Sequence, residues 1–132
     1  MLTVDALVEG VHFEPGWLSA RQIGRKSFLV NASDIAAMGG RPRWCLVSIA
    51  VPPRYAVRDL FAVQAGITAA ARACGATVVG GNLTAAEQLA VSISLVPAIY
   101  QTVVLVMLVY AVLSLPLAQS SVRASAELCR AT

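Results

Sequence analysis

The pattern of apolar and polar positions divides the first 96 residues into two helices and four strands. A capping-box sequence at 19–22, followed by apolar residues up to Gly39, predicts a helix of nearly twenty residues. Apolar residues at three- and four-residue steps predict a second helix over 57–74, ended by Gly75. Short apolar or alternating runs predict strands. These lie at 2–5, 44–51, 77–79 and 89–96, so that the order is β-α-β-α-β-β.

The pattern changes near Pro97. No charged residue occurs from Gln88 to Val122, and residues 98–118 contain a long apolar run. This run has about the ~20 residues that a bilayer-spanning helix needs. A buried β segment, or a tail foreign to the preceding domain, explains the same run, so three interpretations stay open. The sequence predicts one domain at 1–96 and an apolar tail at 97–132 whose structure it does not fix.

The length and composition exclude several classes of protein. The chain has 132 residues, which is about one domain. Hydrophobic residues make up 58% and charged residues 13%, a composition that argues against intrinsic disorder. The net charge of +3 is spread along the chain, so no nucleic-acid partner is expected. Three widely spaced cysteines indicate neither a disulfide framework nor a zinc site, and we expect a cytoplasmic location.

Three polar side chains stand where a bound cation or phosphate would explain them. Asp5 ends an apolar predicted strand, where an uncompensated carboxylate is costly to bury. Asp34 lies near the C-terminal end of the first predicted helix, where the helix dipole disfavours negative charge. Asn82 follows two glycines at a predicted strand end, and oxygen donors from separate elements suit a magnesium–phosphate site. Taken alone, the spacing favours a plainer interpretation, in which Asp5 pairs with an arginine, Asp34 is solvated and Asn82 forms a turn.

Other candidate chemistry is limited. His12 is the only histidine, so it either contacts a ligand or has a structural role, but it does not form a zinc site. Four basic residues in and after the first predicted helix either face a polyphosphate or are solvated: Arg25, Lys26, Arg41 and Arg43. Neither a P-loop nor a nucleophile-elbow motif occurs, so no catalytic nucleophile is predicted.

Four motifs resemble the N-terminal domain of the thiamine-monophosphate kinase family. They are T-V-D-A-L-V-E-G-V-H-F at 3–13, I-G-R-K at 23–26, N-A-S-D-I-A-A-M-G-G at 31–40 with Pro42 behind it, and G-G-N at 80–82. This family belongs to the superfamily of aminoimidazole ribonucleotide synthetase. The resemblance covers residues 1–96 and implies an α/β (α+β) fold, in which a mixed sheet carries two helices on one face.

The resemblance also implies a function, namely phosphorylation of thiamine monophosphate to thiamine diphosphate by ATP, with Mg²⁺ as cofactor. The metal ligands carried over from the family are Thr3, Val4, Asp5, Asp34 and Asn82. His12 matches the residue that contacts the substrate, and Gly81 with Asn82 lies in the nucleotide-binding motif. The implied partners are ATP, thiamine monophosphate and a second copy of the chain, paired through the sheet. Membrane association is expected only if residues 98–118 span a bilayer.

Two departures from the family pattern change the expectation. Asn82 stands where the family has aspartate, so one metal site should be weaker. The family's upstream acidic motif and its second domain have no counterpart in the 132 residues, so we expect this chain to be impaired or inactive alone. The alternatives are a relative that acts on another phosphate acceptor, and a non-catalytic dimerising or membrane-tethered module.

Overall fold

The computed structural model describes residues 2–14 and 16–98, and Met1–Ala98 form one compact unit. Nearly all of the predicted tail at 97–132, including its apolar run, lies outside the described residues. The elements are β1 (Thr3–Val8), α1 (Ala20–Ala37), β2 (Pro42–Val51), α2 (Val57–Ala73), β3 (Thr77–Ala85) and β4 (Ala90–Pro97). Neither of the two helices in this part is both long and apolar enough to cross a bilayer.

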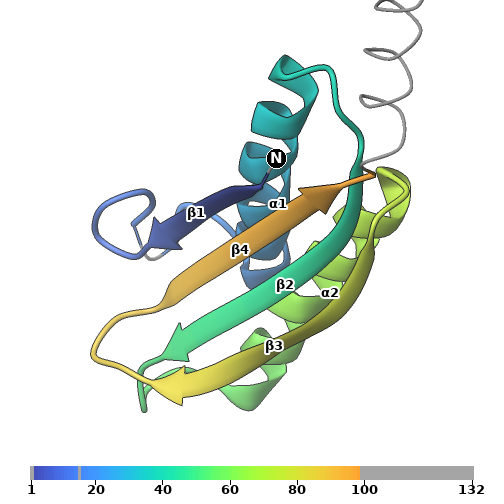
Figure 1. Ribbon diagram of the computed structural model, residues 1–132. Helices are drawn as coiled ribbons and strands as arrows, with labels where there is room; N and C mark the ends of the chain where they lie inside the picture. Colours follow the sequence, from blue (N-terminus) through green and yellow to red (C-terminus); the bar gives the residue numbers. More distant parts are fainter. Residues whose placement is uncertain (1, 15, 99–132) are drawn as a thin grey trace, which may run out of the picture. The chain divides into compact units, whose positions relative to one another are not determined.

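The four strands form one mixed sheet in the order β1-β4-β2-β3. β4 is antiparallel to both of its neighbours, whereas β2 and β3 are parallel and are joined through α2. Both helices lie behind the sheet in Figure 1, α1 against β1 and β4, and α2 against β3. The predicted element order and the mixed sheet with two helices on one face are therefore confirmed.

The core lies between the sheet and the two helices. Along β4, Val91, Ile93 and Leu95 are fully buried, while the alternate residues are half-buried on the other face. The alternation that predicted this strand therefore marks its buried face. On β2 the same side of the sheet carries the buried residues Cys45 and Val47.

Both helices begin and end where the sequence indicates. Ser19 accepts a hydrogen bond from the Gln22 amide, and the Gln22 side chain accepts one from the Ser19 amide, so the capping box is complete. Gly39 and Gly75 follow the two helix ends with φ of 72° and 74°, a conformation that glycine adopts without strain. These predictions are confirmed.

Two strand boundaries differ from the prediction. β1 runs on to Val8, so Asp5 lies inside the strand and not at its end. β3 passes through Gly80 and Gly81, which were predicted to break it, and Asn82 is therefore a mid-strand residue. The reason is non-local, because a Cβ on Gly81 would collide with the carbonyl oxygen of Val47 on β2. Glycine here permits the parallel pairing.

Candidate functional site

Oxygen donors gather where β1 passes the last turns of α1. Thr3 is 8% exposed and Val4 is 60% exposed, so Thr3 and Asp5 both face the helices. The hydroxyl Oγ1 of Thr3 lies 3.3 Å from Oδ1 of Asn31 and 3.5 Å from Oδ2 of Asp34. The fold therefore brings Thr3 and Asp34, which are 31 residues apart in sequence, into contact.

Asn31 belongs to this cluster, although sequence reasoning did not single it out. Its side chain is fully buried, and its Nδ2 donates to the carbonyl of Ser27 at 3.2 Å. The signal in the sequence is its place on α1, because Asn31 stands midway between Ser27 and Ile35 on the buried stripe of the helix. A buried amide needs partners, and Asn31 finds one of them on β1.

Asp5 adds a second carboxylate on the same side of β1. Its Oδ1 accepts a hydrogen bond from the amide of Ala6 at 2.7 Å, and the residue is half-buried. Within residues 2–14 and 16–98, neither Asp5 nor Asp34 forms a salt bridge, so the proposed arginine partner of Asp5 is not found there. Val4 points to the other face and offers only its backbone carbonyl.

Asn82 lies far from this cluster within one chain. Across the four strands Asp5 is level with Ile93, Val47 and Gly81, so Gly81 shares its face and Asn82 points to the opposite face. β1 and β3 are the two edges of the sheet, about 14 Å apart for three strand spacings of ~4.8 Å. A single chain therefore does not bring Asp5 and Asn82 together. In the described part of the chain, no group of three His, Cys, Asp or Glu side chains lies close enough together to hold a metal ion by itself.

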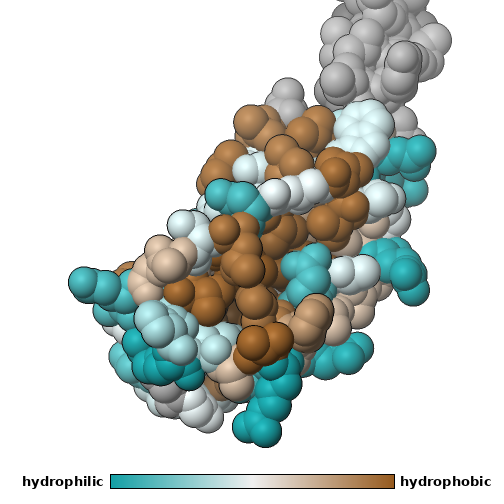
Figure 2. All heavy atoms as spheres, turned by 90° about the horizontal axis from the view of Figure 1, so that it is seen from below, coloured by the Kyte–Doolittle hydropathy of each residue, from teal (hydrophilic) through white to brown (hydrophobic). Residues whose placement is uncertain are grey.

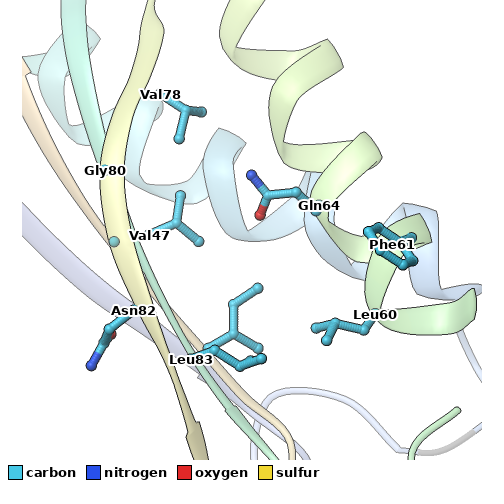
Figure 3. Close-up of a pocket in the computed structure, with 10 residues that line it drawn as sticks. Val47, Leu60, Phe61, Gln64, Val78, Gly80, Asn82 and Leu83 are labelled. Carbon is cyan, nitrogen blue, oxygen red and sulfur yellow. The ribbon is translucent and has the colours of Figure 1, made fainter. Parts of the chain in front are cut away.

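A groove of about 540 Å³ lies between α2 and the helix-facing side of β2 and β3. Its walls are mostly apolar, and Phe61 stands at its rim with 71% of its surface exposed. Figure 3 shows the amide of Gln64 pointing from α2 into the groove, and the side chain of Asn82 pointing away from it. The lining residues are Val47, Ile49, Leu60, Phe61, Gln64, Val78, Gly80, Gly81, Asn82 and Leu83. The groove thus combines apolar surface with one amide that can both donate and accept.

His12 lies in the loop after β1 and is exposed. Its Nδ1 accepts a hydrogen bond from the amide of Val8 at 3.0 Å, so the ring hydrogen is on Nε2. Lys26 Nζ donates to the carbonyl of His12 at 3.1 Å. The imidazole therefore presents an N–H donor to the outside of the loop.

Residues 1–99 match the family model described as AIR synthase related protein, N-terminal domain. The chain belongs to the AIR synthase related family. Relatives of this domain include the thiamine-monophosphate kinase of Bacillus subtilis, 37% identical over 97 residues, which are 73% of this chain and 30% of that protein. The Aquifex aeolicus enzyme of the same name is 36% identical over 96 residues, covering 73% and 31% of the two chains. The resemblance stated from four motifs is confirmed.

Solved structures agree with this AIR synthase related assignment. The crystal structure of thiamine monophosphate kinase from Aquifex aeolicus superposes with a TM-score of 0.70 at 36% identity, covering 74% of this chain and 32% of that one. A second structure, AaThiL complexed with AMPPCP and TMP, gives 0.70 at 36% identity, with coverage of 73% and 31%. The hydrogenase maturation protein HypE in complex with ATP gives 0.62 at 20% identity, covering 74% and 30%, and supports the fold alone. The domain spans about a third of the length of these proteins.

Proposed function

We propose that this AIR synthase related domain is the nucleotide- and magnesium-binding part of a kinase that phosphorylates thiamine monophosphate with ATP. The relatives named thiamine-monophosphate kinase support the reaction, and a relative complexed with AMPPCP, an ATP analogue, and TMP supports the ligands. Because the chain spans about a third of those relatives, we expect it to bind its ligands weakly and to transfer phosphoryl poorly alone.

The observation that carries the proposal is the groove between α2 and β3 (Figure 3). Its apolar walls suit a purine ring, and Phe61 offers an aromatic face for stacking. The amide of Gln64 can donate to and accept from the edge of the base. Gly80 lacks a side chain and its open side meets only the end of the Leu46 side chain, so a phosphate can approach the backbone there, whereas the space beside Gly81 is taken by the backbone of Val47. Gly81 and Asn82 line the same wall, and we propose that they bind the nucleotide through their backbone, since the Asn82 side chain points away from the groove.

The cluster on β1 and α1 suits Mg²⁺. Thr3, Asp5 and Asp34 supply a hydroxyl and two carboxylates, which are the hard oxygen donors that Mg²⁺ prefers. We propose that these three side chains hold the ion, with the backbone carbonyl of Val4 as a further oxygen. The bound ion would offset the negative charge of the ATP phosphates, which is a large part of what phosphoryl transfer requires.

A homodimer formed through the sheet would complete this site. Val4, Trp44 and Leu46 expose large apolar side chains, and the strand register puts them on the face opposite to the buried residues of β4. Both helices lie on the other face of the sheet (Figure 1). Figure 2, which views the unit from below Figure 1, shows that apolar surface also gathers as a continuous band on that side. Two sheets that close on each other set their edges side by side, so that β3 of one copy could lie near β1 of the other. Because Gly81 is on the same face as Asp5, the backbone at Gly81 of one copy would then approach Asp5 of its partner, while the Asn82 side chain would point to the other face.

Calorimetric titration of ATP with Mg²⁺ into the 132-residue chain tests the groove. We expect Gln64→Leu to weaken ATP binding about tenfold, the worth of one hydrogen bond to the base. Gln88→Leu is the matched control, because Gln88 is an exposed glutamine in the turn between β3 and β4 and does not line the groove. Equal affinity of the Gln64→Leu variant and the unaltered chain would place the base elsewhere.

A further inference from the structure

Glu9 and Arg54 form a clasp that joins three loops. Nη2 of Arg54 donates to Oε1 and Oε2 of Glu9 at 2.9 and 3.0 Å. Nη1 of Arg54 donates to the carbonyl of Glu87 at 2.8 Å, and the amide of Leu89 donates to Oε2 of Glu9 at 3.0 Å. Glu9 follows β1, Arg54 precedes α2, and Glu87 and Leu89 lie between β3 and β4. The clasp therefore ties the loop after β1 to the end of the sheet.

Both the carboxylate and the backbone amide of Glu9 form hydrogen bonds that stabilise the clasp. The side chain of Glu9 is only 13% exposed, and its own amide donates to the carbonyl of Leu89 at 2.9 Å. The Leu89 amide, with help from Arg54 and against the effect of burial, lowers the pKa of Glu9 below its ordinary value. Glu9 is therefore ionised at neutral pH, and hydrogen bonds to a charged acceptor are about twice as strong as neutral ones.

The loop held by this clasp is the one that carries His12. The amide of Gly10 donates to the carbonyl of Phe13 at 2.9 Å, and the amide of His12 donates to the carbonyl of Val8 at 2.8 Å. The amide of Val8 in turn donates to Nδ1 of His12 at 3.0 Å. The imidazole ring is thus hydrogen-bonded to the backbone of Val8, the residue just before Glu9. The direction in which the ring points therefore depends on how the loop leaves β1.

We propose that Glu9 and Arg54 are positioning residues, which fix the loop over 9–13 so that Nε2–H of His12 points at an acceptor oxygen of the substrate. The substrate contact of His12 rests on the proposed function, whereas the coupling of the clasp to the imidazole does not. Arg54 acts through Glu9, and Glu9 acts through the backbone of the loop. Neither residue needs to touch the substrate.

Nitrogen NMR of the single histidine tests the coupling without any ligand. At about pH 8, where imidazoles are ordinarily neutral, we expect His12 to be protonated on Nε2, with Nδ1 shifted by its hydrogen bond. Arg54→Met should move the Nδ1 signal towards that of a freely solvated imidazole and should shift the Val8 amide proton upfield. Arg58→Met is the matched control, because Arg58 is a more exposed arginine nearby whose ion pair with Asp59 is long, at 3.7 Å.

Binding of thiamine monophosphate, measured by calorimetry on the same proteins, forms the second arm. We expect Arg54→Met to weaken binding about tenfold and to have no further effect in a His12→Ala background, because coupled residues are not additive. If the His12 signals of Arg54→Met and the unaltered chain coincide, the positioning role is wrong, whatever the affinities are. If the signals change but the unaltered chain does not bind thiamine monophosphate, the positioning role stands and the proposed substrate contact fails.

Discussion

Gly24 on α1 and Gly66 on α2 mark the point where the two helix backbones touch. A Cβ on Gly24 would collide with the carbonyl of Val63, and a Cβ on Gly66 would collide with the carbonyl of Arg21. Each glycine thus faces the backbone of the opposite helix. The close approach sets how both helices lie on the sheet, and so where α1 holds Asp34 and where α2 forms its wall of the groove.

Replacement of Gly66 by alanine should destabilise the domain. Helix propensity alone would stabilise such a variant by about 1 kcal/mol, whereas forcing a methyl group into a backbone contact costs roughly 1–3 kcal/mol or more. We expect a net loss in the free energy of unfolding, measured by urea denaturation. Ala65→Gly, at an exposed position of the same helix, measures the difference in helix propensity between alanine and glycine without the backbone contact. A Gly66→Ala variant more stable than the unaltered chain would refute the helix contact.

Gly81 should be far less tolerant of a side chain than its neighbour Gly80. A Cβ on Gly81 meets the backbone of Val47, but a Cβ on Gly80 meets only the end of the Leu46 side chain at 3.3 Å, which can move. Gly81→Ala should therefore loosen the pairing of β3 with β2 and weaken ATP binding, while Gly80→Ala retains the fold. Thermal unfolding followed by circular dichroism and calorimetric titration with ATP test this difference. Equal melting temperatures and equal ATP affinities of the two variants would contradict the prediction.

The thiol of Cys45 should be unreactive in the folded domain. Cys45 is fully buried, and burial raises its pKa to about 11. Cys74 at the end of α2 is only half-buried. In a Cys129→Ser background we expect one thiol to react quickly with a maleimide and the second to react only on unfolding. Equal rates for both thiols in the folded state would contradict the burial of Cys45.

The contribution of Glu9 to stability should depend on pH. Because the pKa of Glu9 is lower in the folded state than its ordinary value of 4.5, its ionised form stabilises the fold above that value. This stabilisation is lost as the pH falls through the lowered pKa. We expect Glu9→Gln to be less stable than the unaltered chain at neutral pH, and the gap to close in strong acid. Urea denaturation of both proteins from neutral pH to strong acid measures this difference in the free energy of unfolding. A difference that does not change with pH would contradict an ionised Glu9 in the clasp.

Local signals predicted most of the fold. Helix bounds follow from the capping box at Ser19 and from the glycines after each helix, because these residues satisfy helix ends through near neighbours. The alternation of β4 likewise marks its buried face. The strand through Gly80 and Gly81 was missed, since its reason is the backbone of Val47, which lies more than thirty residues away in sequence.

The candidate site was less predictable from the sequence, because it too depends on contacts between residues that are far apart along the chain. Local rules place Thr3 and Asp5 on one face of a strand, but they do not indicate that Asp34 approaches Thr3. The 45-residue separation between Glu9 and Arg54 hides the clasp from any pattern along the chain. The position of Asn82 on the opposite face and edge follows from the order of the strands, which only the folded sheet determines.

Magnesium-dependent binding of ATP to the 132-residue chain tests the central claim most directly. We predict calorimetric binding that requires Mg²⁺, is lost in Asp34→Ala and is retained in Asp59→Ala, which removes a carboxylate from the first turn of α2. A folded chain that does not bind ATP with Mg²⁺, or an Asp34→Ala variant that binds it as tightly as the unaltered chain, would contradict the account. The first of these results would favour a non-catalytic dimerising module.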